Sequence, residues 1–338
     1  MGEQKTVKCL IWDLDNTLWD GTLLEDEAVT LRPRAAEVLS ELDRRGILLS
    51  VASKNEPADA LAKLQELGLD EYFLAPQIGW GSKADAVAEI AKRLNLGLDT
   101  FAFIDDQPAE REEVVFVSPE VRVYDAAQYA EILDLPEFMP RFVTEDSRLR
   151  RRMYREDIER LDAETGFAGS REDFLRTLGM RLTLAPVAEG DLERVEELTL
   201  RTSQLNSTGA VFSYEELCGF IESPNHLLLV AEMADKFGHY GKIGLVLAEK
   251  GEKSLRIKLL LMSCRVMTRG VGSALLCWLT GYAAAHGLAL EADFVPTARN
   301  RIMYITYKLM GFEDVDGTLH YRGELRDIPD YLRLDSMI

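Results

Sequence analysis

Two aspartates stand two residues apart directly after an apolar run near the start of the chain. Asp13 and Asp15 follow the predicted strand 8–12. In extended backbone, residues i and i+2 share one face, so both carboxylates are predicted to point into the same site. Two carboxylates at such close range repel each other unless a cation lies between them, and oxygen-rich clusters favour magnesium. The pair therefore predicts a carboxylate site for metal-assisted chemistry.

Three further polar features follow apolar runs downstream. Ser53 and Lys54 follow one run, Lys83 begins a predicted helix, and Asp105 and Asp106 follow another run. Ligands of a parallel sheet bind outside the carboxyl ends of its strands, so these side chains are expected to meet Asp13 and Asp15. Carboxylates can hold Mg²⁺, while a hydroxyl and ammonium groups can bind phosphate oxygens. The set is typical of phosphate chemistry assisted by magnesium.

The elements that must position these residues alternate from Val7 to about Leu135. Apolar runs over 8–12, 47–52 and 101–104 are typical of strands buried on both faces, and segments 35–45, 57–67 and 82–94 have helical spacing. This alternation predicts an α/β domain with a parallel sheet in three layers. The segments between the motifs are too short for a large inserted cap domain.

Residues 145–164 are densely charged, with an apolar stripe at helical spacing. We place them in a charged helical linker over 141–178, between a first domain over 1–140 and a second over 179–338. The linker holds the densest basic cluster of the chain, Arg148, Arg150, Arg151, Arg152 and Arg155. This cluster is a candidate docking surface for an acidic partner, and a solvated helix face explains it equally well.

The second domain is predicted to be a mixed α/β unit. Its apolar strand 255–262 leads into Arg269-Gly270-Val271-Gly272 and an apolar helix over 273–285. Backbone amides at the start of such a helix can bind phosphate, and glycines permit a close approach. A plain strand-to-helix connection is the alternative interpretation of this turn.

Composition excludes several classes of protein. The 338 residues carry a formal net charge of −19, which argues against a nucleic-acid-binding surface. No apolar run approaches the length that spans a bilayer, so a membrane protein is excluded. Four cysteines without tight pairing, Cys9, Cys218, Cys264 and Cys277, do not form a disulfide framework, and no charged-then-apolar leader precedes the first strand. We expect a cytoplasmic location.

The ordered motifs of residues 7–135 resemble the haloacid dehalogenase superfamily of aspartate-nucleophile phosphatases. This resemblance implies that Asp13 takes up the phosphoryl group and that Asp15 protonates the leaving oxygen and then activates water. It implies Mg²⁺ held by Asp13, Asp105, Asp106 and the backbone carbonyl of Asp15. The remaining residues that it implies bind phosphate: Ser53, Lys54 and Lys83.

The C-terminal half resembles the GCN5-related acyltransferase fold. The resemblance rests on the glycine turn after strand 255–262 and on a later segment with Asn300, Tyr304 and Gly311-Phe312. The residues that it implies for an acyl or pantetheine site are Arg265, Arg269, Gly270, Gly272 and Asn300.

Seven short sequence motifs are spread over the chain: DLDNTLW (13–19), SKN (53–55), FIDD (103–106), RTSQLN (201–206), FGHYG (237–241), MSCRV (262–266) and PTARN (296–300). Together they resemble the FkbH-like family of glyceryl transferase/phosphatases. The resemblance implies that 1,3-bisphosphoglycerate is the substrate. It also implies a glyceryl thioester on the enzyme, which passes to an acyl carrier protein in polyketide biosynthesis.

A thiol nucleophile is needed for that thioester. Cys264 ends a strand beside Arg265, whose charge would favour the thiolate, and Cys9 is the second choice. His239, in a loop flanked by glycines, is a candidate base for the thiol, and a plain turn residue is nearly as well supported.

Two other classes of function stay open. One is a magnesium-dependent small-molecule phosphatase fused to an acetyl-CoA-dependent N-acetyltransferase. The other is an adaptor for carrier proteins in which one site has lost its activity.

Overall fold

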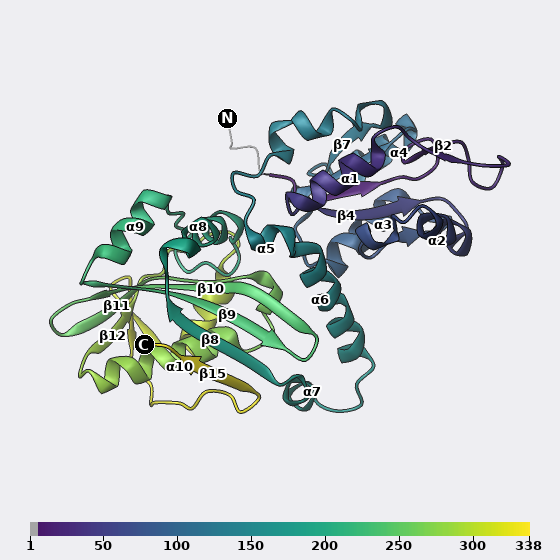
Figure 1. Cartoon of the computed structure of the whole chain (residues 1–338). Coiled ribbons are helices and arrows are strands. Elements are labelled where there is room, and N and C mark those ends of the chain that lie inside the picture. The colour runs from purple at the N-terminus through teal and green to yellow at the C-terminus, as the bar shows by residue number, and fades with distance from the viewer. Residues whose placement is uncertain (1–5) are drawn as a thin grey trace. The chain divides into compact units, whose positions relative to one another are not determined.

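The computed structural model describes residues 6–338, which divide into two compact units between Glu159 and Arg160 (Figure 1). Both are α/β, as predicted. Within residues 6–338, no helix is long and apolar enough to cross a membrane.

Five parallel strands form the sheet of the first unit, in the order β5-β4-β1-β6-β7. The strands are β1 (Cys9–Trp12), β4 (Leu48–Ser53), β5 (Gln77–Ile78), β6 (Phe101–Asp105) and β7 (Arg122–Asp125). The predicted parallel sheet is confirmed. The short antiparallel pair β2 (Trp19–Asp20) and β3 (Thr30–Leu31) lies between β1 and the first helix along the chain, and no large inserted domain separates these elements, as expected.

Side chains of β1 alternate between two apolar layers. Leu10 and Trp12 belong to one layer, and Cys9 and Ile11 to the other. Four helices cover the two faces: α1 (Ala35–Arg44), α2 (Pro57–Glu66), α3 (Lys83–Arg93) and α4 (Pro108–Val117). The first two contribute to the layer of Leu10, and the last two to the layer of Cys9. Burial on both faces explains why β1 is a continuous apolar run.

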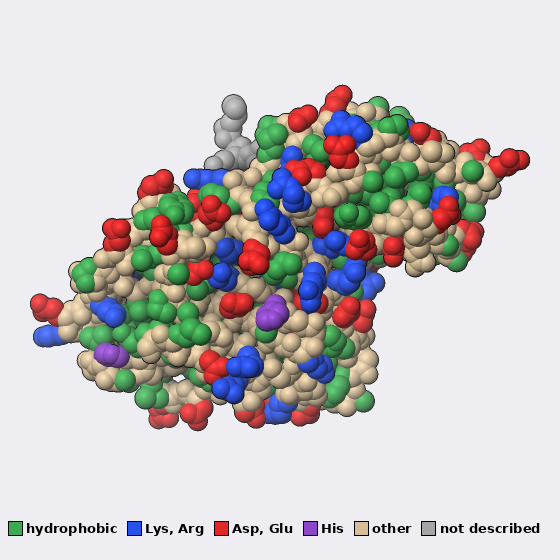
Figure 2. Space-filling model, viewed as in Figure 1, with side chains coloured by type: hydrophobic (Ala, Val, Ile, Leu, Met, Phe, Trp, Pro, Cys, Tyr) green, Lys and Arg blue, Asp and Glu red, His purple; other side chains and the backbone are tan. Residues whose placement is uncertain are grey.

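The predicted linker consists of α5 (Glu145–Arg148), α6 (Arg150–Thr165) and α7 (Arg171–Leu178), and the boundary between the units falls within α6. Its arginines mostly contact the first unit. Arg150 is buried and donates to the carbonyl of Gly46 (2.9 Å), and Arg151 pairs with Asp43 (2.9 Å). Arg150 and Arg151 are thus engaged by the first unit, whereas Arg148, Arg152 and Arg155 are exposed, and docking of an acidic partner on this cluster stays a prediction. On the face shown in Figure 2, basic side chains lie interspersed with acidic ones.

An eight-stranded mixed sheet forms the second unit, in the order β13-β14-β12-β11-β10-β9-β8-β15. The strands are β8 (Met180–Pro186), β9 (His226–Asp235), β10 (Gly238–Lys250), β11 (Ser254–Met262), β12 (Ala289–Ala292), β13 (Phe312–Val315), β14 (Thr318–Tyr321) and β15 (Leu332–Ser336). Two pairings are parallel, β11 with β12 and β15 with β8. The mixed α/β prediction is confirmed.

Helices cover both faces of this sheet. The larger apolar layer includes side chains of α7, α10 (Val271–Ala285) and α11 (Arg301–Leu309), and the smaller includes those of α8 (Leu192–Arg201) and α9 (Tyr214–Glu222). The single-turn helix η7 (Cys264–Val266) follows β11 directly. It places Cys264 between the end of a central strand and the start of α10.

Candidate active site

Three carboxylates meet at the carboxyl ends of two neighbouring strands. Asp13 follows β1, Asp105 ends β6, and Asp106 is the next residue. One oxygen from each lies within 4.8 Å of the other two. The sequence predicted that these three residues meet, and in the structure they do. The reason is that β1 and β6 pair in parallel and end at the same edge of the sheet.

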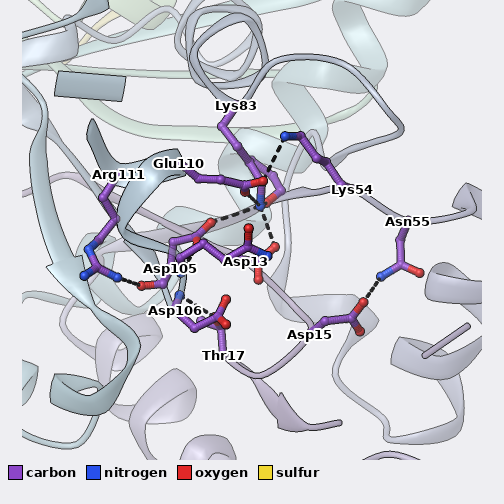
Figure 3. A network of polar contacts seen from close by, with 12 residues as sticks. Asp13, Asp15, Thr17, Lys54, Asn55, Lys83, Asp105, Asp106, Glu110 and Arg111 are labelled. Atoms are coloured by element: carbon purple, nitrogen blue, oxygen red, sulfur yellow. Dashed lines mark hydrogen bonds and ion pairs between the residues drawn. The ribbon is translucent and has the colours of Figure 1, made fainter. Parts of the chain in front are cut away.

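Lys83 binds this cluster from the first residue of α3, where the hydroxyl of Ser82 caps the helix. Its Nζ atom lies 2.5 Å from Oδ1 of Asp13 and 3.1 Å from Oδ2 of Asp105, and it donates to the carbonyl of Ala52 (2.9 Å) (Figure 3). The side chain is buried. Lys83 therefore holds two carboxylates in place, in addition to the phosphate role expected from the sequence.

Burial and mutual repulsion act on the three acids. Burial raises the pKa of Asp13 and that of Asp106 above the usual range. Burial, followed by the negative charge of Asp13, raises the pKa of Asp105 to about 7. Burial opposes the charge of Lys83, but the charges of Asp13 and Asp105 outweigh it and raise the pKa of the ammonium. The cluster has more negative charge than one lysine neutralises, which favours a bound cation.

Glu110 links the two lysines of the site, Lys54 and Lys83. It is not among the site residues predicted from the sequence. Its carboxylate lies 3.0 Å from Nζ of Lys83 and 2.9 Å from Nζ of Lys54. Burial opposes its ionisation, but the bonds and charges of the two lysines outweigh burial and lower the pKa of Glu110. The residue lies in the first turn of α4, one helix turn beyond Asp106, and that spacing is the signal that could have found it.

The carboxylate of Asp15 lies apart from the cluster. It accepts hydrogen bonds from Trp19 Nε1 (2.7 Å), the amide of Leu23 (3.1 Å) and Nδ2 of Asn55 (2.8 Å), and in Figure 3 it points toward Asn55. The prediction that both side chains point into one site is wrong in this conformation. The strand ends at Trp12, so the alternation of extended backbone does not continue to Asp15. A metal contact through its backbone carbonyl stays a prediction.

Further groups fix the acids of β6. The hydroxyl of Thr17 accepts from the amide of Asp106 (3.1 Å), and the amide of Gln107 donates to Oδ1 of Asp105 (2.8 Å). Arg111 donates to the carbonyl of Asp105 (2.6 Å). These contacts fix the two residues at the end of β6, and both carboxylate oxygens of Asp105 accept a hydrogen bond, one from Gln107 and one from Lys83.

The thiol and the base predicted for acyl transfer lie in the second unit. Cys264 is partly buried in η7, and its Sγ atom lies 3.6 Å from Oε1 of Gln204. Arg265 donates from its guanidinium to the carbonyl of Tyr240 (2.6 Å). His239 is exposed and pairs with Ala234 in the hairpin of β9 and β10. Stabilisation of the Cys264 thiolate by Arg265, and the role of His239 as a base for the thiol, both stay predictions.

The glycine turn before α10 is covered by the chain itself. Gly270 has a φ of +77°, and a Cβ atom there would lie 2.5 Å from the hydroxyl of Tyr331. Arg269 is buried and pairs with Glu164 (3.0 Å). At Gly272, a Cβ atom would lie 3.0 Å from Cε of Met262. The side chains of Tyr331 and Met262 therefore lie against this turn, and the phosphate-binding role of Arg269, Gly270 and Gly272 stays a prediction.

Asn300 is a structural residue. It is fully buried, and its Nδ2 atom donates to the carbonyls of Asn206 (2.9 Å) and Val295 (3.0 Å). Its Oδ1 atom accepts from the amide of Thr297 (2.8 Å). Since both ends of the amide bind backbone groups, the predicted pantetheine contact of Asn300 is wrong. Its role is to join the loop between α8 and α9 to the segment after β12.

A family model of haloacid dehalogenase-like hydrolases matches residues 23–112. The matched range contains Ser53, Lys83, Asp105 and Asp106 and begins after Asp13. The first unit is a haloacid dehalogenase-like hydrolase domain.

Solved structures resemble each unit. The N-terminal part of a Bacteroides fragilis protein, which contains a phosphatase domain complexed with Mg, is 32% identical over 38% of this chain and 40% of its own, with a TM-score of 0.35. An alanine N-acetyltransferase for a ribosomal protein from Escherichia coli is 15% identical over 41% of this chain and 88% of its own (TM-score 0.32). An aminoglycoside 6'-N-acetyltransferase from Acinetobacter baumannii is 12% identical over 43% of this chain and 99% of its own (TM-score 0.32). No curated protein matches the chain.

The hydrolase domain fits a magnesium ion by its own donors. Oδ1 of Asp106 is buried and has no hydrogen-bond partner within residues 6–338. The carboxylate of Asp106 also supplies one of the three oxygens, with Asp13 and Asp105, that lie within 4.8 Å of one another. Oxygen ligands with excess negative charge suit Mg²⁺. A buried carboxylate oxygen that lacks a hydrogen-bond partner is unfavourable unless a cation binds it.

A pocket of about 610 Å³ in the hydrolase domain is lined in part by Lys83, the residue that also contacts Asp13 and Asp105. Ser53 and Lys54 line it from the end of β4, and Lys83 lines it from α3. The outer wall is the loop that carries Gly79 and Gly81. The three residues predicted to bind phosphate therefore share one pocket.

Proposed function

We propose that this chain is a bifunctional glyceryl transferase/phosphatase. It takes 1,3-bisphosphoglycerate, holds glyceryl as a thioester on Cys264, removes phosphate with Mg²⁺ in the hydrolase domain, and loads glyceryl onto an acyl carrier protein for polyketide biosynthesis. The observation that carries the proposal is the cluster of Asp13, Asp105 and Asp106 held by the buried Lys83, which also lines a pocket with Ser53 and Lys54.

In the phosphatase step, an Oδ atom of Asp13 forms a bond to phosphorus while the bond from phosphorus to the ester oxygen breaks. The leaving oxygen takes a proton from Asp15, which then removes a proton from the water that releases inorganic phosphate. Asp13, Asp105 and Asp106 would hold Mg²⁺, which supplies charge neutralisation for the phosphoryl group. Lys83 keeps Asp13 in position, and Lys54 and Ser53 face the phosphate oxygens.

Asp15 must move to serve as the acid. Its three donors, Trp19, Leu23 and Asn55, hold it away from Asp13 in this conformation. A turn of its side chain on substrate binding requires that the bond from Asn55 be released. Asn55 is fully buried next to Lys54, so the same strand end positions both the phosphate ligand and the residue that holds the acid.

In the transfer step, the Sγ atom of Cys264 attacks the carbonyl carbon of the acyl phosphate. The carbon–oxygen bond to phosphate breaks, and the departing phosphate takes up the thiol proton. The thiol of the carrier then attacks the thioester, and Cys264 leaves with that proton. Burial supports Cys264 over Cys9, because Cys9 is fully enclosed and burial raises the pKa of its thiol. Burial likewise raises the pKa of Cys277.

The N-acetyltransferase alternative needs a place for the pyrophosphate of CoA. The contact of Tyr331 with Gly270 and the pairing of Arg269 with Glu164 count against it.

Two measurements on the whole chain test the proposal. Phosphate release from the monoester of 3-phosphoglycerate should require Mg²⁺ and stop with EDTA. Intact-protein mass spectrometry after mixing with 1,3-bisphosphoglycerate should show a glyceryl-type adduct that a holo carrier protein removes. Turnover of acetyl-CoA with an amine, without any adduct, would replace the transferase with the alternative.

A further inference from the structure

One face of α11 is apolar and exposed. The helix buries Met303 and Tyr307 in the core of the second unit, while Ile302, Ile305 and Leu309 are 37%, 45% and 69% exposed. These three residues are spaced i, i+3 and i+7, so they form one stripe along the helix. A contiguous apolar stripe on the surface marks an interaction site more often than scattered apolar residues do.

Basic residues flank the stripe. The segment 295–310 contains Arg299, Arg301 and Lys308 and no aspartate or glutamate, although the whole chain carries a net charge of −19. Arg326 adds a cation at the C-terminal end, where it donates to the carbonyl of Leu309 (2.9 Å). Acidic residues resume at Glu313 on β13. The apolar stripe is therefore bordered by basic residues in a chain of negative net charge.

The stripe lies on the helix that packs beside the turn of Cys264. Thr306 of α11 comes within 3.5 Å of the Cβ position of Gly272, and the side chain of Met262 contacts the same glycine. Met262 precedes Cys264 by two residues. A partner on α11 would thus be next to the elements that carry the thiol.

We propose that this face, Ile302, Ile305 and Leu309 with Arg301 and Lys308, is the docking surface for an acidic amphipathic helix of the acyl carrier protein. The proposal rests on the function proposed above. An acidic helix with an apolar stripe matches the face in both respects, whereas the net charge of −19 on the whole chain disfavours its approach elsewhere on average. The match favours a protein helix over an anionic membrane, because α11 has only nine residues and buries its other face.

Binding to a carrier protein tests the surface without the acyl chemistry. The probe is an acidic type II acyl carrier protein in its apo form, which has no thiol, titrated into the full chain by calorimetry at low salt. The variants Ile305→Glu and Lys308→Glu should each weaken binding by about tenfold or more. A matched control is Ile221→Glu, an exposed isoleucine of α9, 38% exposed, which should bind as the wild type does. Thermal unfolding of each variant verifies that it is folded.

Three outcomes would overturn the docking proposal: no binding to the wild type, equal weakening by Ile221→Glu, or binding unchanged in both α11 variants. Binding of the wild type to phosphatidylserine vesicles that Ile305→Glu abolishes, without carrier binding, would assign the face to membranes instead. The adduct on Cys264 is measured without a carrier, so a failed transferase and a failed docking surface give different results.

Discussion

The Nζ atom of Lys83 lies 2.5 Å from Oδ1 of Asp13, and both side chains are buried. The two residues are far apart in sequence, one after β1 and the other at the start of α3. Their contact holds the proposed nucleophile in one position before substrate arrives, so little reorganisation is left for the reaction itself.

Asp13→Asn should lower phosphate release by about a thousandfold or more, because an amide cannot form the phosphoryl–enzyme bond. The fold should persist, since the amide keeps the shape of the side chain. Phosphate assays on 3-phosphoglycerate, with circular dichroism of the variant, check both statements. Wild-type turnover in Asp13→Asn would remove Asp13 from the mechanism.

The stability of the metal-free hydrolase domain should fall as pH rises from about 4 to about 7. Asp105 keeps its proton in the folded state up to a pKa of about 7, whereas an unfolded aspartate loses it near pH 4. The folded state thus binds the proton more tightly, and its contribution to stability is complete below about pH 4 and lost as pH rises through 7.

In Asp105→Asn, the stability of the hydrolase domain should depend less on pH between about 4 and 7. With saturating Mg²⁺, the stability of the wild type should instead rise over this pH range, because the metal binds deprotonated ligands. Thermal unfolding of both proteins at pH 5 and pH 8, with and without Mg²⁺, measures the effect. An equal pH dependence in wild type and Asp105→Asn would contradict the assignment.

Arg160→Ala should destabilise the second unit by about 3–5 kcal/mol, because it leaves Asp235 buried without its counterion. Nε of Arg160 lies 2.8 Å from Asp235, both side chains are fully buried, and Tyr240 donates to the same carboxylate (2.9 Å). Calorimetric unfolding is the measurement. Arg333→Ala, which breaks the exposed pair with Asp335, is the control and should cost less than about 1 kcal/mol. Equal losses in the two variants would refute this account.

Cys264→Ser should lose the glyceryl-type adduct that the wild type acquires from 1,3-bisphosphoglycerate. Phosphate release from the monoester should survive, since the chemistry of Asp13 needs no thiol. Cys9→Ala should keep the adduct. Its free energy of unfolding should fall by about 1 kcal/mol, because the substitution removes one buried atom from the core. An adduct that persists in Cys264→Ser and disappears in Cys9→Ala would move the nucleophile to β1.

Local sequence was enough to predict the parallel sheet and the meeting of Asp13, Asp105 and Lys83. Strands buried on both faces are continuous apolar runs, and the carboxyl ends of parallel strands share an edge, so position along the chain predicts position in space. The cap of Ser82 on α3 was likewise readable from a four-residue pattern.

Other features depend on contacts between residues that no local pattern connects. Glu110 joins Lys54 and Lys83 only because α4 begins beside β4 and α3. Asp15 turns toward Asn55 because β1 ends at Trp12, and the exact end of a strand depends on its neighbours. Tyr331 covers Gly270 because the chain returns to pair β15 with β8, a pairing of segments more than a hundred residues apart. Periodicity reports which face of an element is buried, whereas tertiary packing decides which polar groups meet there.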